Sequence, residues 1–239
     1  MQSSAAIRAD ASTGSETFTV HASDTAGMDM HRHPDMRIIR PSILYFGTPV
    51  VLITTCNEDG SINITPMSSA WALADRIVIG LSGGGQGLAN LRRERECVLN
   101  LAGEDMHRGV ERIAPTTGRQ PVPPWKQATG YRHEPDKFAL GGWHAVPSPD
   151  VKPPRIMECS LQLEARVRLD IDRPLDAWRD GPGGYAILEL EVLHVHAHED
   201  VTVPGTQHVD PQRYRPLFYL FRHYVGPGKP LGKTFKAEV

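Results

Sequence analysis

The chain has 239 residues and a formal net charge of −2, with 40% hydrophobic and 23% charged residues. This length suits one domain with a substantial core, and the interspersed charges argue against a protein that grips the nucleic-acid backbone. Residues 1–30 lack the apolar stretch of a secretory signal, and no apolar run reaches the roughly eighteen residues of a membrane span. We therefore expect a cytoplasmic protein without a membrane or nucleic-acid partner.

The cysteines Cys56, Cys97 and Cys159 are widely spaced, and each has apolar neighbours. An odd number at these spacings suits neither a disulfide framework nor a zinc site. We expect three reduced thiols in the core, which fits a reducing compartment.

The N-terminal part of the chain differs in composition from the rest. Residues 1–35 are rich in Ser, Thr, Ala and Asp and contain few large apolar side chains. Such a segment buries too little surface to offset the entropy lost on ordering. We predict a mobile arm over residues 1–35 and one domain over residues 36–239.

Strand patterns dominate the first half of the domain. Residues 48–66, TPVVLITTCNEDGSINITP, join a β-branched run to an alternating run through Glu-Asp-Gly, which predicts a hairpin. Residues 76–82, RIVIGLS, predict a further strand. The spacing of Leu88 and Leu91 predicts a short amphipathic helix over residues 87–96, and CVLNLAG at 97–103 predicts another strand.

Residues 103–156 are rich in proline and weakly periodic, which indicates a long excursion with one short helix near residues 106–114. Residues 160–171 and 185–201 then alternate strictly and predict a second antiparallel pair. The first of these strands places five apolar residues on one face: Leu161, Leu163, Ala165, Val167 and Leu169.

The C-terminal residues 213–233 combine an aromatic cluster with Gly-Pro punctuation, so we expect a short docked helix followed by an extended run. About six strands with a helix after the third indicate a small antiparallel barrel, which protects its own strand edges. The predicted class is mainly β with few helices.

The glycines at 83–85 and 87 stand between a predicted strand and a predicted helix. Backbone N–H groups at a helix start lack internal partners, and the helix dipole adds about half a positive charge there. The dinucleotide fingerprint is incomplete because Leu88 replaces its third glycine, and no Gly-Lys-Ser/Thr follows. The residues alone leave a phosphate site and a plain flexible turn open.

Three histidines, His194, His196 and His198, alternate along a predicted strand and therefore share one face. They could ligate a transition metal, but solvent-facing histidines near a strand end require none. His-Glu-x-x-His does not occur, and no nucleophile stands with a clear base, which argues against hydrolysis by the usual routes. The four tryptophans are expected to anchor packing: Trp71, Trp125, Trp143 and Trp178.

The stretch NITPMSSAW at 63–71 is too polar to make a good core. It belongs to a set of segments that together resemble the flavin reductase-like, FMN-binding split-barrel family: residues 48–73, 76–101, 136–167, 186–201 and 215–226. The order and spacing of the segments match over residues 38–239. The resemblance implies a six-stranded split barrel, a homodimer, and FMN in a groove at the subunit interface.

In that family, the segment corresponding to NITPMSSAW runs along the flavin. Small residues let the backbone approach, and their hydroxyl and amide groups replace the water bonds that the flavin loses on burial. The resemblance places cofactor contacts on Asn63, Thr65, Ser68 and Ser69, and on the backbone of Ala70.

The next family motif holds the FMN phosphate at the helix start and falls here on Gln86-Gly87 and Asn90-Leu91. The sequence departs from that motif, because Gly87 replaces a hydroxyl residue and Gln86 replaces an acid. Phosphate contacts are then expected from backbone amides and from Ser82 or Gln86. The compensating cation is left open among three basic residues: Arg92, Arg93 and Lys233.

The resemblance implies that a nicotinamide nucleotide passes hydride to the flavin, so no dedicated catalytic side chain is expected. One alternative is an FMN-binding protein without turnover, acting as an electron carrier or binding partner. Another is a flavoenzyme that keeps FMN as a fixed group and acts on another substrate. In that case the excursion would shape a second-substrate pocket with Trp125, His133, Trp143 and His144. A metal enzyme built on the three histidines ranks last.

Overall fold

The structure, a computed structural model, describes residues 36–174 and 184–234. The chain divides into two units, residues 1–40 and residues 41–239. Of the first unit only residues 36–40 are described, and they have no regular secondary structure. The predicted arm over residues 1–35 and Trp178 lie outside the described residues. Within the described ranges, no helix is long and apolar enough to cross a membrane.

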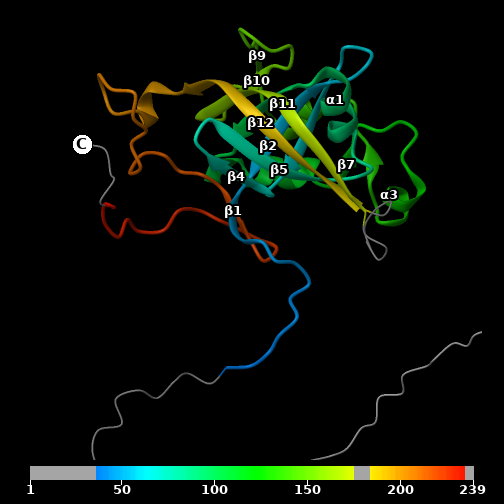
Figure 1. Cartoon of the computed structure of the whole chain (residues 1–239), viewed down its shortest axis with the longest axis horizontal. Coiled ribbons are helices and arrows are strands. Elements are labelled where there is room, and N and C mark those ends of the chain that lie inside the picture. The colour runs from blue at the N-terminus through cyan, green and yellow to red at the C-terminus, as the bar shows by residue number, and fades with distance from the viewer. Residues whose placement is uncertain (1–35, 175–183, 235–239) are drawn as a thin grey trace, which may run out of the picture. The chain divides into compact units, whose positions relative to one another are not determined.

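The second unit contains a large antiparallel sheet, three small sheets and short helices (Figure 1). Its strands are β1 Phe46–Pro49, β2 Val51–Cys56, β3 Ile62–Met67, β4 Ala70–Leu73, β5 Arg76–Ser82, β6 Glu96–Leu101, β7 Thr116–Thr117, β8 Arg132–His133, β9 Ala145–Val146, β10 Arg155–Ile156, β11 Leu161–Pro174, β12 Gly184–Ala197, β13 Phe218–Leu220 and β14 His223–Val225. Its helices are α1 Gln86–Glu94, α2 His107–Ile113, α3 Pro124–Ala128 and α4 Lys137–Gly141, with 3-10 turns at Glu104–Met106 and Glu199–Val201.

The large sheet is curled, and its two edge strands, β3 and β4, follow each other directly in the sequence. In the described residues it has seven strands in the order β3-β2-β6-β11-β12-β5-β4. Only Ser68 and Ser69 separate β3 from β4, so the sheet must bend round until its edges approach each other. No ladder joins these edges among the described strands, which leaves a seam. The predicted mainly β split-barrel class is confirmed, with β4 as a strand beyond the expected six.

The predicted hairpins and the first predicted helix are confirmed. The β2–β3 pair turns through residues 57–61, and β5 has the predicted bounds. Helix α1 runs between β5 and β6, as the spacing of Leu88 and Leu91 predicts, and both leucines are buried. The helix expected in the excursion is α2.

The long strands β11 and β12 pair as predicted and belong to the large sheet (Figure 1). Their apolar alternation is interrupted. The pairing of the strands shifts between Val167 and Leu169, where a β-bulge adds one residue to β11. A bulge reverses the face on which later side chains lie. The prediction that Leu169 faces the core is therefore wrong, because its side chain is 47% exposed while Val167 is buried.

The prediction of a C-terminal helix is also wrong. Strands β13 and β14 form a hairpin, and β13 pairs with β1. Phe221 and Arg222 make the tight turn of this hairpin with positive φ angles of 42° and 71°. The aromatic run suits a pleated strand better than a helix because β-branched and aromatic side chains pack well there. Residues 226–234 follow without regular structure.

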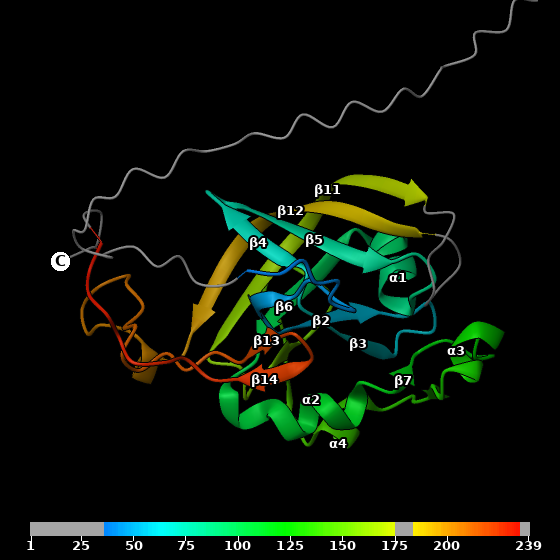
Figure 2. The same ribbon diagram turned by 90° about the horizontal axis from the view of Figure 1, so that it is seen from below.

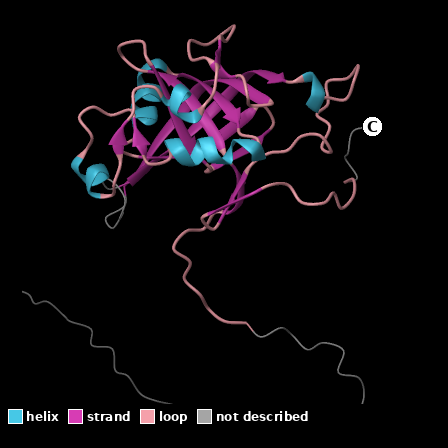
Figure 3. Cartoon of the chain, turned by 180° about the vertical axis from the view of Figure 1, so that it is seen from behind, coloured by secondary structure: helices cyan, strands magenta, loops and turns pink. Residues whose placement is uncertain are grey.

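Two apolar clusters lie on opposite faces of β2. Val51 and Ile53 belong to the cluster enclosed by the curled sheet, whereas Val50 and Leu52 belong to a second cluster. Figure 2 shows α2 and α4 beside each other below the sheet, where this second cluster lies. Seen from behind, in Figure 3, helices lie against the strands of the sheet. Burial on both faces explains why β2 is continuously apolar.

The two clusters also contain two of the thiols. Cys97 and Cys159 are buried as predicted, but Cys56 is half-buried at the end of β2. Burial raises the pKa of the Cys97 thiol to about 12. This thiol therefore stays protonated and packs as a small apolar group.

Leu188 and Leu169 test the effect of the bulge. Leu188→Ala should lower the free energy of unfolding by about 2–5 kcal/mol, because truncation of a buried leucine loses transfer free energy and leaves a cavity. Leu169→Ala removes the same atoms from a partly exposed side chain and should cost less than about 1 kcal/mol. Denaturant unfolding of both variants measures the difference. Equal losses would show that Leu169 is packed in the core.

Candidate functional site

A cavity of about 340 Å³ opens at the seam of the curled sheet. The edge strand β3 lines it with Asn63, Thr65, Pro66 and Met67, and β5 faces it with Gly80, Leu81 and Ser82. Tyr45 also lines the cavity, as do Gly85, Gln86 and Leu88 at the start of α1. The excursion supplies the remaining lining residues: Ala114, Thr116, Thr117, Gly118, Trp125, Lys126, Tyr131 and Lys137.

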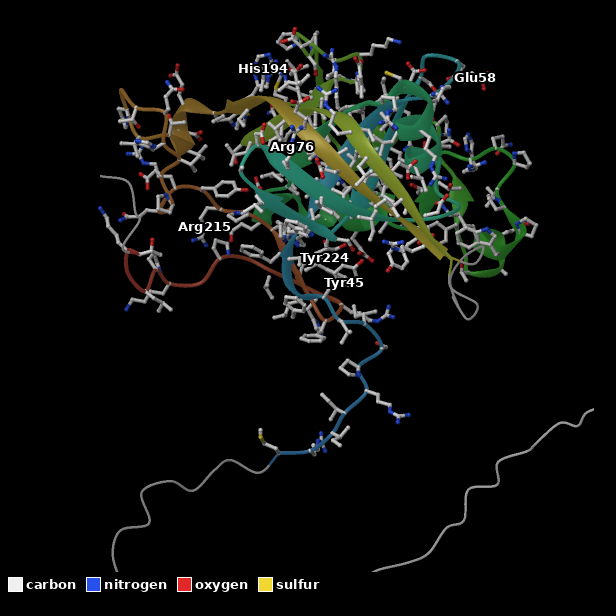
Figure 4. The ribbon with its side chains drawn as sticks, viewed as in Figure 1. Tyr45, Glu58, Arg76, His194, Arg215 and Tyr224 are labelled. Atoms are coloured by element: carbon white, nitrogen blue, oxygen red, sulfur yellow. The ribbon has the colours of Figure 1, made fainter. Side chains whose placement is uncertain are left out.

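The link between the two edge strands is held against β5. The Gly80 N–H donates to the Ser69 carbonyl oxygen at 2.8 Å, and a Cβ on Gly80 would lie 3.3 Å from Ser69 Cβ. The Ser69 hydroxyl forms a hydrogen bond of 2.7 Å with the Tyr45 hydroxyl. Ser69 therefore positions Tyr45, and Figure 4 shows Tyr45 just before β1, at the lower side of the domain.

Helix α1 begins at the cavity with its first N–H groups uncapped. Gly85 at its N-cap has extended backbone angles and supplies no side-chain cap. Gly87 packs so closely on β3 that a Cβ there would collide with Thr65 Oγ1. The glycine thus lets the helix start approach the strand, and the unsatisfied N–H groups and helix dipole favour an anion there.

Within the described part of the chain, two buried polar atoms of the cavity-lining residues have no hydrogen-bond partner, namely Asn63 Oδ1 and Ser82 Oγ. The Asn63 side chain is 2% exposed, and its Nδ2 donates to Thr65 Oγ1 at 3.0 Å. A buried polar atom left unsatisfied costs about 1–3 kcal/mol. These two oxygens are therefore set up to bond a polar ligand that enters the cavity.

Two lysines from the excursion bring positive charge to the cavity. Lys137 is 4% exposed, and its Nζ donates to the Ile64 carbonyl oxygen at 2.8 Å. Burial, with a smaller effect of Lys126, lowers the pKa of Lys137 to about 7, against the opposing effect of Glu134. Among the described residues, neither lysine forms an ion pair. A buried cation with a perturbed pKa in a cleft is typical of a functional site.

Lys126 is the less buried of the two. Its Nζ lies 5.3 Å from the ring centroids of Trp125 and Tyr131 and donates to Thr117 Oγ1 at 3.3 Å. Burial lowers the pKa of the Lys126 ammonium, and Arg119 adds to the effect. The two aromatic faces stabilise the ammonium and fix its position.

Four of the predicted cofactor-binding residues line this cavity: Asn63, Thr65, Ser82 and Gln86. Five others do not line it: Ser68, Ser69, Ala70, Gly87 and Asn90. Ser68 is buried, Ala70 packs against the enclosed apolar cluster, and Gly87 faces Thr65. Their predicted contacts with the cofactor stay predictions.

Asn90 is a positioning residue in this arrangement. It is buried, and its Nδ2 donates to Thr55 Oγ1 at 3.0 Å and to Asn57 Oδ1 at 2.8 Å. Its Oδ1 accepts from Gln86 Nε2 at 2.8 Å. Because both ends of the amide are bonded, Asn90 orients Gln86 toward the cavity wall and ties α1 to the end of β2.

None of the three candidate compensating cations lines the cavity. Arg92 bonds Asp170 and Asp172, and the Arg93 guanidinium donates to the Cys56 carbonyl oxygen at 2.6 Å. Lys233 is exposed. Lys126 and Lys137 are the basic residues that line it among those described, and the sequence signal for them was weak because both stand in a segment without periodicity.

The aromatic and histidine residues outside this wall have varied surroundings. Trp143 is buried in the second apolar cluster as predicted, but Trp71 is 59% exposed on β4, so its prediction as a packing anchor is wrong. His144 pairs with Glu158 at 2.6 Å. Trp125 lines the cavity instead of anchoring the core.

Two of the three alternating histidines on β12 contact carboxylates. His196 Nε2 lies 2.6 Å from Glu164 Oε1, and His194 bonds Asp150 (Figure 4 shows His194 near the β9–β10 loop). In the described part of the chain, no group of three or more metal-ligating side chains is gathered at one point.

The family model for the flavin reductase like domain matches residues 43–228. The chain belongs to this family. An uncharacterized protein of Bacillus subtilis (strain 168), YdfE, is 41% identical over 213 residues, which cover 88% of this chain and 100% of the relative. Membership supports a flavin-related oxidoreductase function, and it confirms the resemblance of segments 48–73, 76–101, 136–167, 186–201 and 215–226.

Solved structures share the split-barrel fold. Flavoredoxin of Desulfovibrio vulgaris (Miyazaki F) has a TM-score of 0.67 and 18% identity, covering 85% of this chain and 99% of its own. Nitrilotriacetate monooxygenase component B from Bacillus cereus has a TM-score of 0.64 and 18% identity, covering 84% and 100%. At these identities the comparison establishes the fold.

The cavity residues fit a flavin nucleotide. Asn63 Oδ1 and Ser82 Oγ offer unused acceptors, and Ser82 also offers a donor, for polar groups of the ring and ribityl chain. Leu81, Met67 and Tyr45 offer apolar and aromatic surface, while the α1 start offers N–H groups to a phosphate.

The buried ammonium of Lys137 predicts a pH dependence of stability. Folded protein binds fewer protons than unfolded protein between pH 7 and the ordinary pKa of 10.5, so its free energy of unfolding should rise with pH across this window. Below the window the cost of the buried charge is fully present. Lys137→Met should lack this rise, as measured by denaturant unfolding at about pH 6 and about pH 10. Parallel pH profiles in both proteins would contradict the assignment.

Proposed function

We propose that this protein binds FMN at the seam and acts as an NAD(P)H-dependent flavin oxidoreductase. The observation that carries the proposal is the cavity itself, in which Asn63 Oδ1 and Ser82 Oγ are buried without partners among the described residues, beside a helix start with no side-chain cap. Unsatisfied buried groups cost free energy, and a polar ligand that bonds them would recover it. Family membership supports a flavin as that ligand.

The phosphate of FMN belongs at the start of α1, between Gln86 and the two excursion lysines. Backbone N–H groups and a helix dipole favour a phosphate there. Lys126 and Lys137 supply positive charge at the point where this sequence departs from the family's phosphate motif. A phosphate beside Lys137 would raise the pKa of its ammonium again, because an opposite charge favours the charged form. Proton uptake on binding follows near pH 7.

The redox chemistry belongs to the cofactor, which when bound accepts two electrons and a proton as hydride from a nicotinamide. The chain's residues bind, orient and exclude water. Tyr45, held by Ser69, and Met67 contribute an apolar wall against which a flat ring system can lie. No side chain is assigned as a catalytic acid, base or nucleophile.

The free edge of β4 supports a homodimer. Trp71 and Leu73 are 59% and 70% exposed on this strand, and its outer backbone edge pairs with no described strand. Exposed apolar side chains on an open edge are a common mark of an interface. The reduced thiols support a cytoplasmic location.

A flavin-binding protein without turnover is the second candidate, because the same cavity would hold a fixed cofactor. The two are separated by one measurement on purified protein. We expect NADH or NADPH to be oxidised faster when FMN is added, with flavin absorbance on the loaded protein. A tightly bound yellow chromophore that neither nucleotide reduces would favour the binder, and failure to bind any flavin would overturn both.

Lys126 and Lys137 test the phosphate assignment. Lys126→Met or Lys137→Met should weaken FMN binding by about ten- to hundredfold, because each removes a charge-assisted hydrogen bond. Riboflavin lacks the phosphate, so its affinity should change by less than about threefold. Titration of flavin fluorescence measures both ligands.

Lys233→Met is the matched control for these variants, since it removes a lysine from the exposed tail. Its FMN affinity should equal that of the original protein. A loss with Lys233→Met and none with the two excursion variants would move the phosphate contact to the tail.

A further inference from the structure

A second cavity of about 440 Å³ adjoins the first near the start of α1. The two cavities share Asn63, Gln86 and Gly118, which lie together because a Cβ on Gly118 would be 2.5 Å from Asn63 Oδ1 and 3.1 Å from Gln86 Cγ. Gly118 therefore packs closely on Asn63 and Gln86, and these three residues form the boundary between the cavities. Groups bound in the two cavities would lie next to each other.

The two cavities carry opposite charge. The first contains Lys126 and Lys137, whereas the second is lined by Glu58, Asp59 and Glu134 and by no lysine or arginine of the described chain. The Ser61 hydroxyl and amide hydrogen bonds hold the pKa of Asp59 below its ordinary value, so this carboxyl is ionised at neutral pH. An anionic group is therefore favoured in the first cavity and disfavoured in the second.

Most of the polar atoms in the second cavity are hydrogen-bond acceptors. Among the described residues, Asn63 Oδ1 and His133 Nδ1 are buried and have no hydrogen-bond partner. Glu58 is exposed at the β2–β3 turn, where Figure 4 labels it. Such a wall suits a neutral group that is rich in donors.

We infer that the second cavity binds the adenosine ribose of the hydride donor and that its carboxylates select NADH over NADPH. The inference rests on the proposed function. A carboxylate accepts hydrogen bonds from a free ribose 2′-hydroxyl, as acidic residues do in other nicotinamide sites. The 2′-phosphate of NADPH is a dianionic group at neutral pH and would face Glu58, Asp59 and Glu134 without a cation.

The charges of the second cavity fit the adenosine of this donor. FMN and its phosphate belong to the first cavity beside Lys126 and Lys137, so the adenosine would lie beyond Gly118, among carboxylates that disfavour a further anion. The adenine amino group and the ribose diol would donate to Glu58 and the other carboxylates there.

The test compares kcat/KM for NADH and NADPH in the full chain with saturating FMN. We expect a preference for NADH of about tenfold or more, because like charges left facing each other weaken binding of NADPH. Glu58→Gln should reduce the preference, and Glu58→Arg should raise kcat/KM for NADPH by about tenfold while leaving FMN affinity unchanged.

Glu199→Arg is the matched control, because it makes the same change of charge at an exposed site that lines neither cavity. It should leave the ratio unchanged. Equal use of both nucleotides, or a ratio that Glu58→Arg and Glu199→Arg shift alike, would overturn the inference while the reductase function stands. A gain in FAD affinity with Glu58→Arg at a constant nucleotide ratio would assign the cavity to the adenylate half of FAD and also overturn it.

Calorimetric titration with NAD⁺ and NADP⁺ separates this inference from the proposed function. If neither reduced nucleotide is oxidised, the reductase function fails. Tighter binding of NAD⁺ than of NADP⁺, reversed by Glu58→Arg, would still support the subsite. Equal or absent binding of the two would overturn it.

Discussion

The structure depends on a strand edge that is left unpaired. Because β3 and β4 are separated by two residues yet lie at opposite edges of one sheet, the sheet curls and its last ladder is missing. The seam exposes backbone groups and side chains of β3 to a cavity instead of to a neighbouring strand. The Ile64 carbonyl oxygen, which a closed barrel would pair with a strand, accepts from Lys137. The same opening makes the fold a container for a ligand.

The long excursion completes that container. Without residues 114–137, the seam would offer polar groups and a helix start but no buried cation. Lys137 is held in an environment that disfavours its charge, and burial lowers its pKa to about 7. Keeping such a group costs stability, and a cost of this kind is typical of positions that serve a ligand. The excursion thus lowers the stability of the fold, and in the proposed function it raises the affinity for FMN.

Much of the fold was predictable from local patterns. Apolar alternation identified the β2–β3 hairpin, β5 and the β11–β12 pair, and leucine spacing identified α1, because these patterns state which side chains need burial. The failures have local physical causes. A bulge after Val167 turned Leu169 outward, and the aromatic tail formed a hairpin because it pairs with β1, a partner that is distant in sequence.

By itself, the sequence determined the mainly β class, two of the strand pairs and the polar character of the stretch at 63–71, together with four of the residues that line the cavity. Only the tertiary structure decided which charges reach that cavity. Arg92 and Arg93 stand beside the glycines in sequence but bond elsewhere, whereas Lys126 and Lys137 come from a segment without a pattern. The physical reason is that periodicity reports burial against a core, while an ion site is set by long-range packing that brings a lone side chain to a strand edge.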